Sequence, residues 1–133
     1  MNQHYLAGFF DGEGSLIIRF KKDSRYASGF QIKPNIDIAQ KNLEVLNKIK
    51  NDLKIGKIYY NKKEKLWHYD IYKFKDIENF ISIIKGKLIV KRDKLKKFEA
   101  CISLILGKQH LDLIGLNKIR KIWLIRESEA NTL

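Results

Sequence analysis

The ten residues from Leu6 to Ser15, LAGFFDGEGS, decide how this chain is interpreted. They begin apolar, become acidic and end in glycine, which predicts the last turns of a helix that stops at Gly14. Asp11 and Glu13 would lie at the C-terminal end of that helix, where the macrodipole disfavours an anion by about 0.3 kcal/mol or more. A divalent cation bound by carboxylate and main-chain oxygens is the natural compensation.

The small residues of the same stretch predict a close helix–helix contact. Gly8 and Gly12 are four positions apart, so they share a helix face, with Ala7 beside them. Small side chains let two helix backbones approach each other. This structural role does not account for Glu13, because a free carboxylate at a tightly packed helix end is costly unless it is paired or bound to a metal.

The charge balance predicts a polyanionic partner. The 133 residues include 27 Lys and Arg against 15 Asp and Glu, which gives a formal net charge of +12. Nucleic acid or an anionic membrane surface would suit that charge, and a solvated basic surface without function is the plain alternative. No run of about 18 apolar residues is present, so we expect no membrane span, and no secretory signal is visible.

The cysteine and histidine content argues for a reducing compartment and against zinc. Cys101 has no second cysteine to pair with and falls on an apolar helical face, which predicts a buried thiol in an intracellular, reducing compartment. One Cys and three scattered His residues do not make a zinc site. Heavy use of Lys, Ile and Asn, whose codons are A/T-rich, points to an organelle, a chloroplast or mitochondrion.

Hydrophobic periodicity predicts an α+β fold in a single domain over residues 1–133. Helices alternate with pairs of strands in the order αββαββα, with further helix at the C-terminal end and helices on one face of the sheet. Asn42 and Asp76 are the predicted N-caps of two helices. The predicted helices cover residues 3–13, 42–54, 76–86, 91–106 and 116–127, and the predicted strands cover residues 15–22, 30–40, 57–61 and 66–72.

The nonapeptide LAGFFDGEG, residues 6–14, resembles the signature of the LAGLIDADG homing endonucleases, and the element order resembles that family's fold over nearly the whole chain. The resemblance implies a four-stranded antiparallel sheet shaped as a saddle, and a homodimer whose two signature helices pack against each other. The dimer interface would be formed by Ala7, Gly8, Asp11 and Gly12, with Asp11 also serving the structure of the helix end.

The resemblance also implies an intron-encoded endonuclease that makes a double-strand break in a long pseudo-palindromic DNA target. Glu13 would be the metal-binding acid, in place of the family's usual Asp, with the Gly12 carbonyl as a second ligand. Divalent cations beside the scissile phosphate supply a nucleophilic water and stabilise developing charge. Mg²⁺ prefers carboxylate, carbonyl and water oxygens and is the expected cofactor. Mn²⁺ is expected to substitute for it, and Ca²⁺ to bind without supporting cleavage.

Two more residues match supporting positions of the family. Gln40, at the end of the second strand, would orient a water, and Lys91, before the helix that follows the second strand pair, would lie near the metal. Alternatively, Gln40 is only a residue at the entry to the next helix, and Lys91 is only a solvated charge. An Arg that some relatives carry a few residues beyond the Gln corresponds to Glu44 here, so that role is lost or has moved to Lys41.

The predicted strand over residues 30–40 alternates between an apolar face and a polar face. A twisted sheet can follow the major groove of double-stranded DNA, so the polar face is interpreted as the DNA-reading surface. Arg and Lys there suit guanine or phosphate, whereas Gln31 and Asn35 suit adenine. The predicted DNA-binding residues are Arg19, Lys21, Gln31, Lys33, Asn35, Asp37, Tyr59, Asn61, Lys63, His68 and Asp70.

Two alternatives come from other functional classes. A non-cleaving DNA- or RNA-binding protein on the same fold, such as an intron maturase or a transcription regulator, is opposed by the presence of Glu13, Gln40 and Lys91. A basic ferredoxin-like RNA-binding module would need paired strand aromatics, whereas Trp67 and Tyr69 are predicted to be core residues. We expect no small-molecule substrate and no membrane partner.

Overall fold

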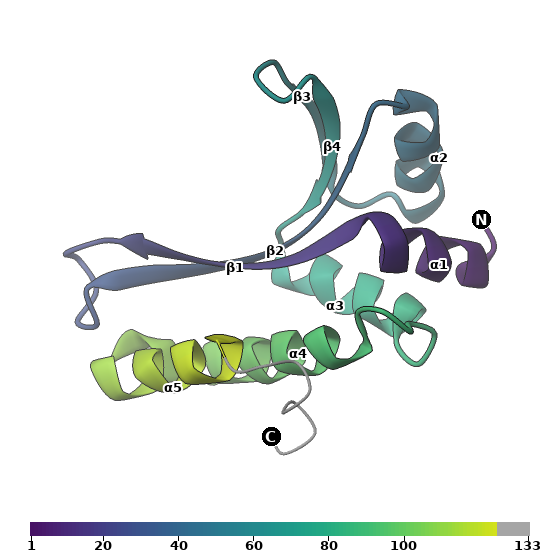
Figure 1. The fold of residues 1–133 in the computed structure, drawn as a ribbon. Coiled ribbons are helices and arrows are strands. Elements are labelled where there is room, and N and C mark those ends of the chain that lie inside the picture. Colours follow the sequence, from purple (N-terminus) through teal and green to yellow (C-terminus); the bar gives the residue numbers. More distant parts are fainter. Residues whose placement is uncertain (125–133) are drawn as a thin grey trace. The chain divides into compact units, whose positions relative to one another are not determined.

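The structure, a computed structural model, describes residues 1–124 (Figure 1). Its contacts group into two compact units. One comprises Met1–Ser15 and Asn35–Val90, and the other comprises Leu16–Pro34 and the described residues from Lys91 onward. The expectation of a single domain over residues 1–133 stays a prediction.

The elements follow the predicted order closely. The strands make one four-stranded sheet in the order β1-β2-β4-β3. β4 is antiparallel to both of its neighbours, with Gln40 opposite Trp67 on one side and Lys57 opposite Asp70 on the other. The α+β class and the αββαββα order are confirmed. The elements are α1 (Gln3–Glu13), β1 (Gly14–Lys22), β2 (Phe30–Gln40), α2 (Leu43–Leu53), β3 (Lys57–Asn61), β4 (Leu66–Ile71), α3 (Phe74–Ile84), α4 (Arg92–Leu106), the 3₁₀ turn η1 (Gln109–Leu111) and α5 (Leu113–Leu124).

In the first unit, α1 is fixed at both ends. The Asn2 side chain accepts hydrogen bonds from the backbone N–H groups of His4 and Tyr5, and this caps the N-terminus. At the other end the chain passes from helix to strand at Gly14, where a Cβ atom would lie 2.1 Å from the Phe10 ring. The close approach of the Phe10 ring therefore leaves room only for glycine at the position where α1 ends.

The core of this unit lies where α1 meets α3 and where α2 packs on β3 and β4. The rings of Phe10 and Phe80 meet edge to face at 5.3 Å between centroids, a favourable aromatic geometry. Tyr69 is fully buried, as predicted, and its hydroxyl donates to the Ile55 carbonyl at 2.8 Å. These contacts hold α1 and the β3–β4 hairpin within one packed body (Figure 1).

The helix caps were predicted with mixed success. Asn42 caps α2 through its side chain, which accepts from the Val45 N–H at 3.1 Å. The predicted cap Asp76 is wrong, because α3 begins after Lys73 and Asp76 lies inside its first turn. An acidic residue is favourable there through the helix dipole without acting as a cap.

In the second unit, α4 and α5 pack side by side (Figure 1). Cys101 is buried, and burial raises the pKa of its thiol to about 12, which keeps it protonated and unreactive. The Arg120 guanidinium lies 4.4 Å from the Phe30 ring and 5.4 Å from the Phe20 ring. α5 begins three residues before the predicted helix start at residue 116, and predicted helix residues 125–127 lie outside the described residues. No helix in the described part of the chain is long and apolar enough to cross a bilayer.

Candidate functional site

The two carboxylates at the end of α1 have different environments. Asp11 is buried, and its Oδ2 accepts hydrogen bonds from the backbone N–H groups of Ile89 and Val90, both at 2.9 Å. Two N–H donors compensate the charge that the helix dipole disfavours, and they tie α1 to the segment after α3. Asp11 is therefore neutralised inside its own chain.

Glu13, in contrast, is exposed and only partly paired. Its Oε2 accepts one hydrogen bond, at 3.0 Å, from Nε2 of Gln40 at the end of β2. The structure therefore brings together two of the three residues predicted for catalysis. A carboxylate offers about four lone-pair sites, so this one contact leaves Glu13 with oxygen sites for a further ligand.

The third residue predicted for catalysis, Lys91, belongs to the second unit, where it is half-buried and precedes the first turn of α4. Glu44 lies exposed in the first turn of α2, and Lys41 is exposed just before that helix. Within residues 1–124, no group of three or more His, Cys, Asp or Glu side chains is arranged to hold a metal ion.

The residues predicted for a dimer interface divide into two pairs. Gly8 and Gly12 are exposed, and a Cβ atom at either position would meet nothing within 4 Å. Ala7 and Asp11 are buried within the chain, so they are not surface residues of the single molecule. The interface itself remains a prediction, and the surface it can use on α1 contains Gly8 and Gly12 but not the other two.

The polar face of β2 and β4 differs from the prediction. Asn35, Asp37 and His68 were predicted to point outward, but they are only 8%, 9% and 8% exposed. Asp37 lies directly opposite Asp70 in the β2–β4 register. Because like charges opposite each other destabilise a sheet, both carboxylates need partners from the chain itself.

Those partners are Asn35 and His68. The Asn35 amide Nδ2 donates to Asp70 Oδ1 at 2.7 Å. His68 Nδ1 lies 3.0 Å from each oxygen of Asp37, and its Nε2 lies 2.7 Å from Glu64 Oε1. The bond to Asp70 uses one of the two N–H donors of the Asn35 amide. Because Asn35 is only 8% exposed, the predicted adenine contact would need the side chain to become more accessible.

The pKa values of the central pair follow from these contacts. Burial raises the pKa of Asp37. The hydrogen bond and charge of His68 lower it, whereas the nearby carboxylates of Asp70 and Glu64 raise it further, and the net shift is upward. Burial alone would lower the pKa of His68, but its hydrogen bonds to Asp37 and Glu64 outweigh burial, and the net shift is upward. The imidazolium between two carboxylates is therefore the favoured charge state.

Aromatic and basic side chains cover this cluster. The Tyr59 ring stacks on the His68 ring at 5.1 Å between centroids and an angle of 7°. Lys57 Nζ lies 5.6 Å from the centre of the Tyr59 ring and 5.2 Å from that of Tyr72. Sequence reasoning missed Glu64 and Lys57; the spacing of Glu64, four residues before His68 across a tight turn, was the available signal.

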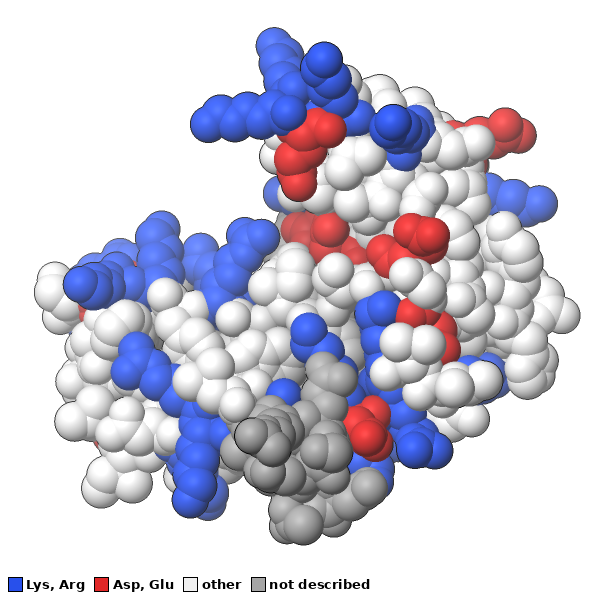
Figure 2. Space-filling model, in the orientation of Figure 1, with Lys and Arg blue, Asp and Glu red and all other residues white. Residues whose placement is uncertain are grey.

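Other predicted DNA-binding side chains are exposed. At the β3–β4 turn, Lys63 lies with Lys62 and Lys65 on the surface. Figure 2 shows blue side chains gathered around red ones at the top of the view, where Figure 1 draws this hairpin. Tyr59 is also exposed, and Asn61 and Asp70 are half-buried. In the second unit, Arg19, Lys21 and Lys33 are exposed and Gln31 is half-buried.

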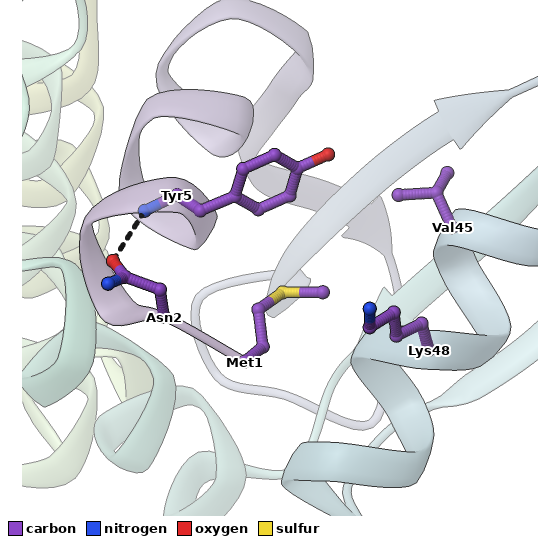
Figure 3. A pocket seen from close by; sticks show the side chains of 5 residues that line it. All are labelled: Met1, Asn2, Tyr5, Val45 and Lys48. Atoms are coloured by element: carbon purple, nitrogen blue, oxygen red, sulfur yellow. Dashed lines mark hydrogen bonds between the residues drawn. The ribbon is translucent and has the colours of Figure 1, made fainter.

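A shallow pocket lies between the start of α1 and α2, away from Glu13 and the β2–β4 face. It is lined by Met1, Asn2, Tyr5, Val45 and Lys48 (Figure 3). Its volume of about 260 Å³ is below the range of pockets that enclose drug-sized ligands. None of the predicted site residues lines it.

Comparison of the sequence with models of known protein families identifies the family of this chain. The sequence model of the LAGLIDADG endonuclease family matches residues 6–105. That match includes α1 from Leu6 onward, the whole sheet and nearly all of α4. The chain belongs to the LAGLIDADG endonuclease family.

Individual relatives cover different parts of the chain. It is 28% identical to DNA endonuclease I-CreI of Chlamydomonas reinhardtii over 90 residues, which are 66% of this chain and 54% of that protein. It is 27% identical to an uncharacterized cox1 intron-2 protein of Schizosaccharomyces pombe over 124 residues, which are 91% of this chain and 37% of that protein. The chain thus spans about half or less of each of these two relatives.

A solved structure resembles nearly the whole chain. The archaeal intron-encoded homing endonuclease I-Vdi141I, complexed with DNA, superposes with a TM-score of 0.83 at 27% identity. The superposition covers 98% of this chain and 82% of that one. The predicted homing-endonuclease fold is therefore confirmed.

Proposed function

We propose that this protein is a site-specific DNA endonuclease that hydrolyses phosphodiester bonds in both strands of a long pseudo-palindromic target. The observation that carries the proposal is Glu13, an exposed carboxylate at the end of the signature helix that, within residues 1–124, is hydrogen-bonded to Gln40 alone. Family membership, the net charge of +12 and the exposed basic side chains support a DNA partner. The DNA complex of the relative I-Vdi141I supports the same partner.

The oxygen donors at this end of α1 fit a magnesium ion. Mg²⁺ keeps several waters and takes only one or two protein carboxylates, and Glu13 supplies one carboxylate in a solvent-accessible position. Glu13 and the Gly12 carbonyl would hold the ion, with phosphate and water oxygens completing its shell. A bound Mg²⁺ would lower the pKa of a coordinated water and stabilise charge on the phosphate. Gln40 would fix the orientation of the Glu13 carboxylate and of a nearby water. Lys91 would stabilise transition-state charge.

A homodimer is part of the proposal, because one chain contributes one Glu13 and a double-strand break needs chemistry on both strands. Gly8 and Gly12 leave open space on the surface of α1, so a second α1 could approach closely. A two-fold dimer matches a pseudo-palindromic site by symmetry. An intron origin and an organelle location agree with the cox1 intron-2 relative and with the buried thiol Cys101.

A cleavage assay on a plasmid library tests the proposal. The library contains randomised inserts, and linearised molecules are recovered and sequenced after incubation with Mg²⁺, Mn²⁺, Ca²⁺ or EDTA. We expect linear product with one recurrent insert in Mg²⁺ and Mn²⁺, and binding of that insert without cutting in Ca²⁺. Specific binding with no cutting in any metal would instead indicate a non-cleaving maturase or regulator.

A further inference from the structure

The turn between β3 and β4 is held in a conformation that its own residues do not favour. Lys65 has a φ of 58°, in the left-handed region that costs a non-glycine residue about 1 kcal/mol or more. Two hydrogen bonds to Asn61 support the turn. The Glu64 N–H donates to Asn61 Oδ1 at 3.1 Å, and the Lys65 N–H donates to the Asn61 carbonyl at 2.8 Å.

A third contact ties the turn to the sheet. Glu64 Oε1 lies 2.7 Å from Nε2 of His68 on β4, while the other ring nitrogen of His68 lies 3.0 Å from Asp37 on β2. The imidazole thus links three parts of the chain: the turn, β4 and β2. Both of its nitrogens are already engaged, and its side chain is 11% exposed and covered by Tyr59. This geometry leaves His68 no free donor for a base edge, contrary to its predicted role.

We propose that protonated His68 is a positioning residue for DNA binding: by bridging Asp37 and Glu64, it holds the turn that presents Lys62, Lys63 and Lys65 in a form that contacts DNA phosphates. The inference rests on the proposed DNA-binding function. If it holds, DNA affinity depends on the protonation of His68, although this side chain contacts neither base nor phosphate.

The hydrogen-bond inventory of histidine gives the mechanism. Imidazolium donates from both ring nitrogens, whereas neutral imidazole donates from only one. When the proton leaves, one carboxylate loses its donor. The Asp37 side chain is 12% exposed, so water cannot readily replace its lost donor, whereas the Glu64 side chain is 49% exposed and can turn to water. Deprotonation therefore releases Glu64, and with it the turn.

The charges around the ring set the direction of the pH dependence. Asp37 from β2 and Glu64 from the turn bond to the ring, and Tyr59 from β3 stacks on it. The nearby charges are Asp70 on β4, which acts on Asp37, and Lys57 on β3, which lies over the Tyr59 ring. The pKa of His68 is raised above its ordinary value of 6.5. The bridge is therefore complete below that ordinary value and is lost as the pH rises through the raised pKa. DNA affinity should fall over the same interval.

The test compares the wild type with Glu64→Ala and His68→Gln, and uses Glu78→Ala, an exposed glutamate on α3, as the matched control. The probe is a fluorescently labelled duplex DNA of random sequence, since phosphate contacts do not depend on sequence. In the wild type we expect DNA affinity to weaken by about three- to tenfold as the pH rises through the His68 titration. A loss of that size corresponds to about one phosphate contact. Glu64→Ala should bind about as weakly as the deprotonated wild type at every pH, and Glu78→Ala should keep the wild-type profile.

Glu64→Ala also separates positioning from simple charge repulsion. Removing a negative charge beside DNA would tighten binding if Glu64 did nothing else, so equal or tighter binding by this variant overturns the proposal. A wild-type affinity that is flat across the titration overturns it too.

An NMR titration of His68 without DNA supplies the independent reading. We expect its pKa to be raised in the wild type and lowered by Glu64→Ala but not by Glu78→Ala. An unchanged His68 pKa in Glu64→Ala overturns the bridge even if the protein cuts DNA. Absent cleavage counts only against the proposed function.

Discussion

The C-terminal end of α1 and the polar face of β2 and β4 both contain acidic side chains in a strongly basic chain. The two regions differ in how completely those carboxylates are hydrogen-bonded within the chain. On the sheet face every carboxylate of the cluster has a partner from the chain: His68 serves Asp37 and Glu64, and Asn35 serves Asp70. At the end of α1, Asp11 accepts from two backbone donors, whereas Glu13 accepts one hydrogen bond, from the Gln40 amide, among the residues that the structure describes.

The difference indicates where a ligand is needed. A carboxylate that the fold has already neutralised contributes to stability, and its loss should weaken the fold. A carboxylate left open and exposed contributes little to stability, and its loss should affect the chemistry that uses it. Glu13 and Asp11 lie two residues apart on one helix, so the contrast can be tested with little else changing.

Glu13→Gln should have the largest effect on activity. The substitution keeps the size of the side chain but removes its charge, so we expect cleavage to slow by about 10³-fold while DNA affinity and unfolding free energy stay near wild type. Cleavage rates, anisotropy binding and urea unfolding measure the three quantities. Glu44→Gln, an exposed glutamate on α2, is the control and should cut normally.

Gln40→Ala should come next. Removing the amide leaves Glu13 without its hydrogen bond and a water without its orienting group, so we expect cleavage to slow by about 10²-fold with binding nearly unchanged. Lys91→Ala should slow cleavage to a similar degree. If either variant lost DNA affinity and cleavage rate to the same degree, the substituted residue would be a DNA-binding residue instead.

Asp11→Asn should give the reverse pattern to Glu13→Gln. It weakens two charge-assisted hydrogen bonds to the Ile89 and Val90 N–H groups, so we expect the unfolding free energy to fall by about 2–3 kcal/mol. Urea denaturation of the two variants side by side makes the comparison. The contrast between the carboxylates fails if Asp11→Asn is as stable as wild type or if Glu13→Gln is the less stable of the two.

Gly8→Leu should affect assembly without harming the single chain. The space around Gly8 is open within the chain, and leucine is a better helix former than glycine by about 0.8 kcal/mol. We therefore expect a folded monomer whose dimerisation is weakened by about 1–3 kcal/mol. Sedimentation velocity reports this directly. A wild type that sediments as a monomer both free and on DNA would contradict the dimer.

The smallest effects are expected for single exposed residues of the second unit. Ala at Arg19, Gln31 or Lys33 should cost about 1–3 kcal/mol at particular target positions and relax the preference there. Lys48→Ala, on α2, should change overall affinity little. Binding-site selection with each variant is the measurement, and an unchanged selected site would show that these strand residues do not read bases.

The sequence allowed most of the fold to be predicted, because the helix and strand periods, the glycine stops and the Asn42 cap are local signals. Through the family resemblance it also singled out Glu13 and Gln40, but not the hydrogen bond between them. It could not predict that Asn35, Asp37 and His68 are buried. A period of two shows which residues share a face, but only the strand register places Asp37 opposite Asp70 and so creates the need for internal partners. Asp76 was taken for a cap because both a cap and a first-turn acid precede an apolar run.

The central claim is that Glu13 is left open for a divalent cation at the DNA. Calorimetric titration of Ca²⁺ into the complex of the protein with its selected target tests it without cleavage interfering. We predict saturable Ca²⁺ binding to the wild-type complex and none to the Glu13→Gln complex, with both proteins holding the DNA equally well. The same Ca²⁺ isotherm for both complexes would contradict the account.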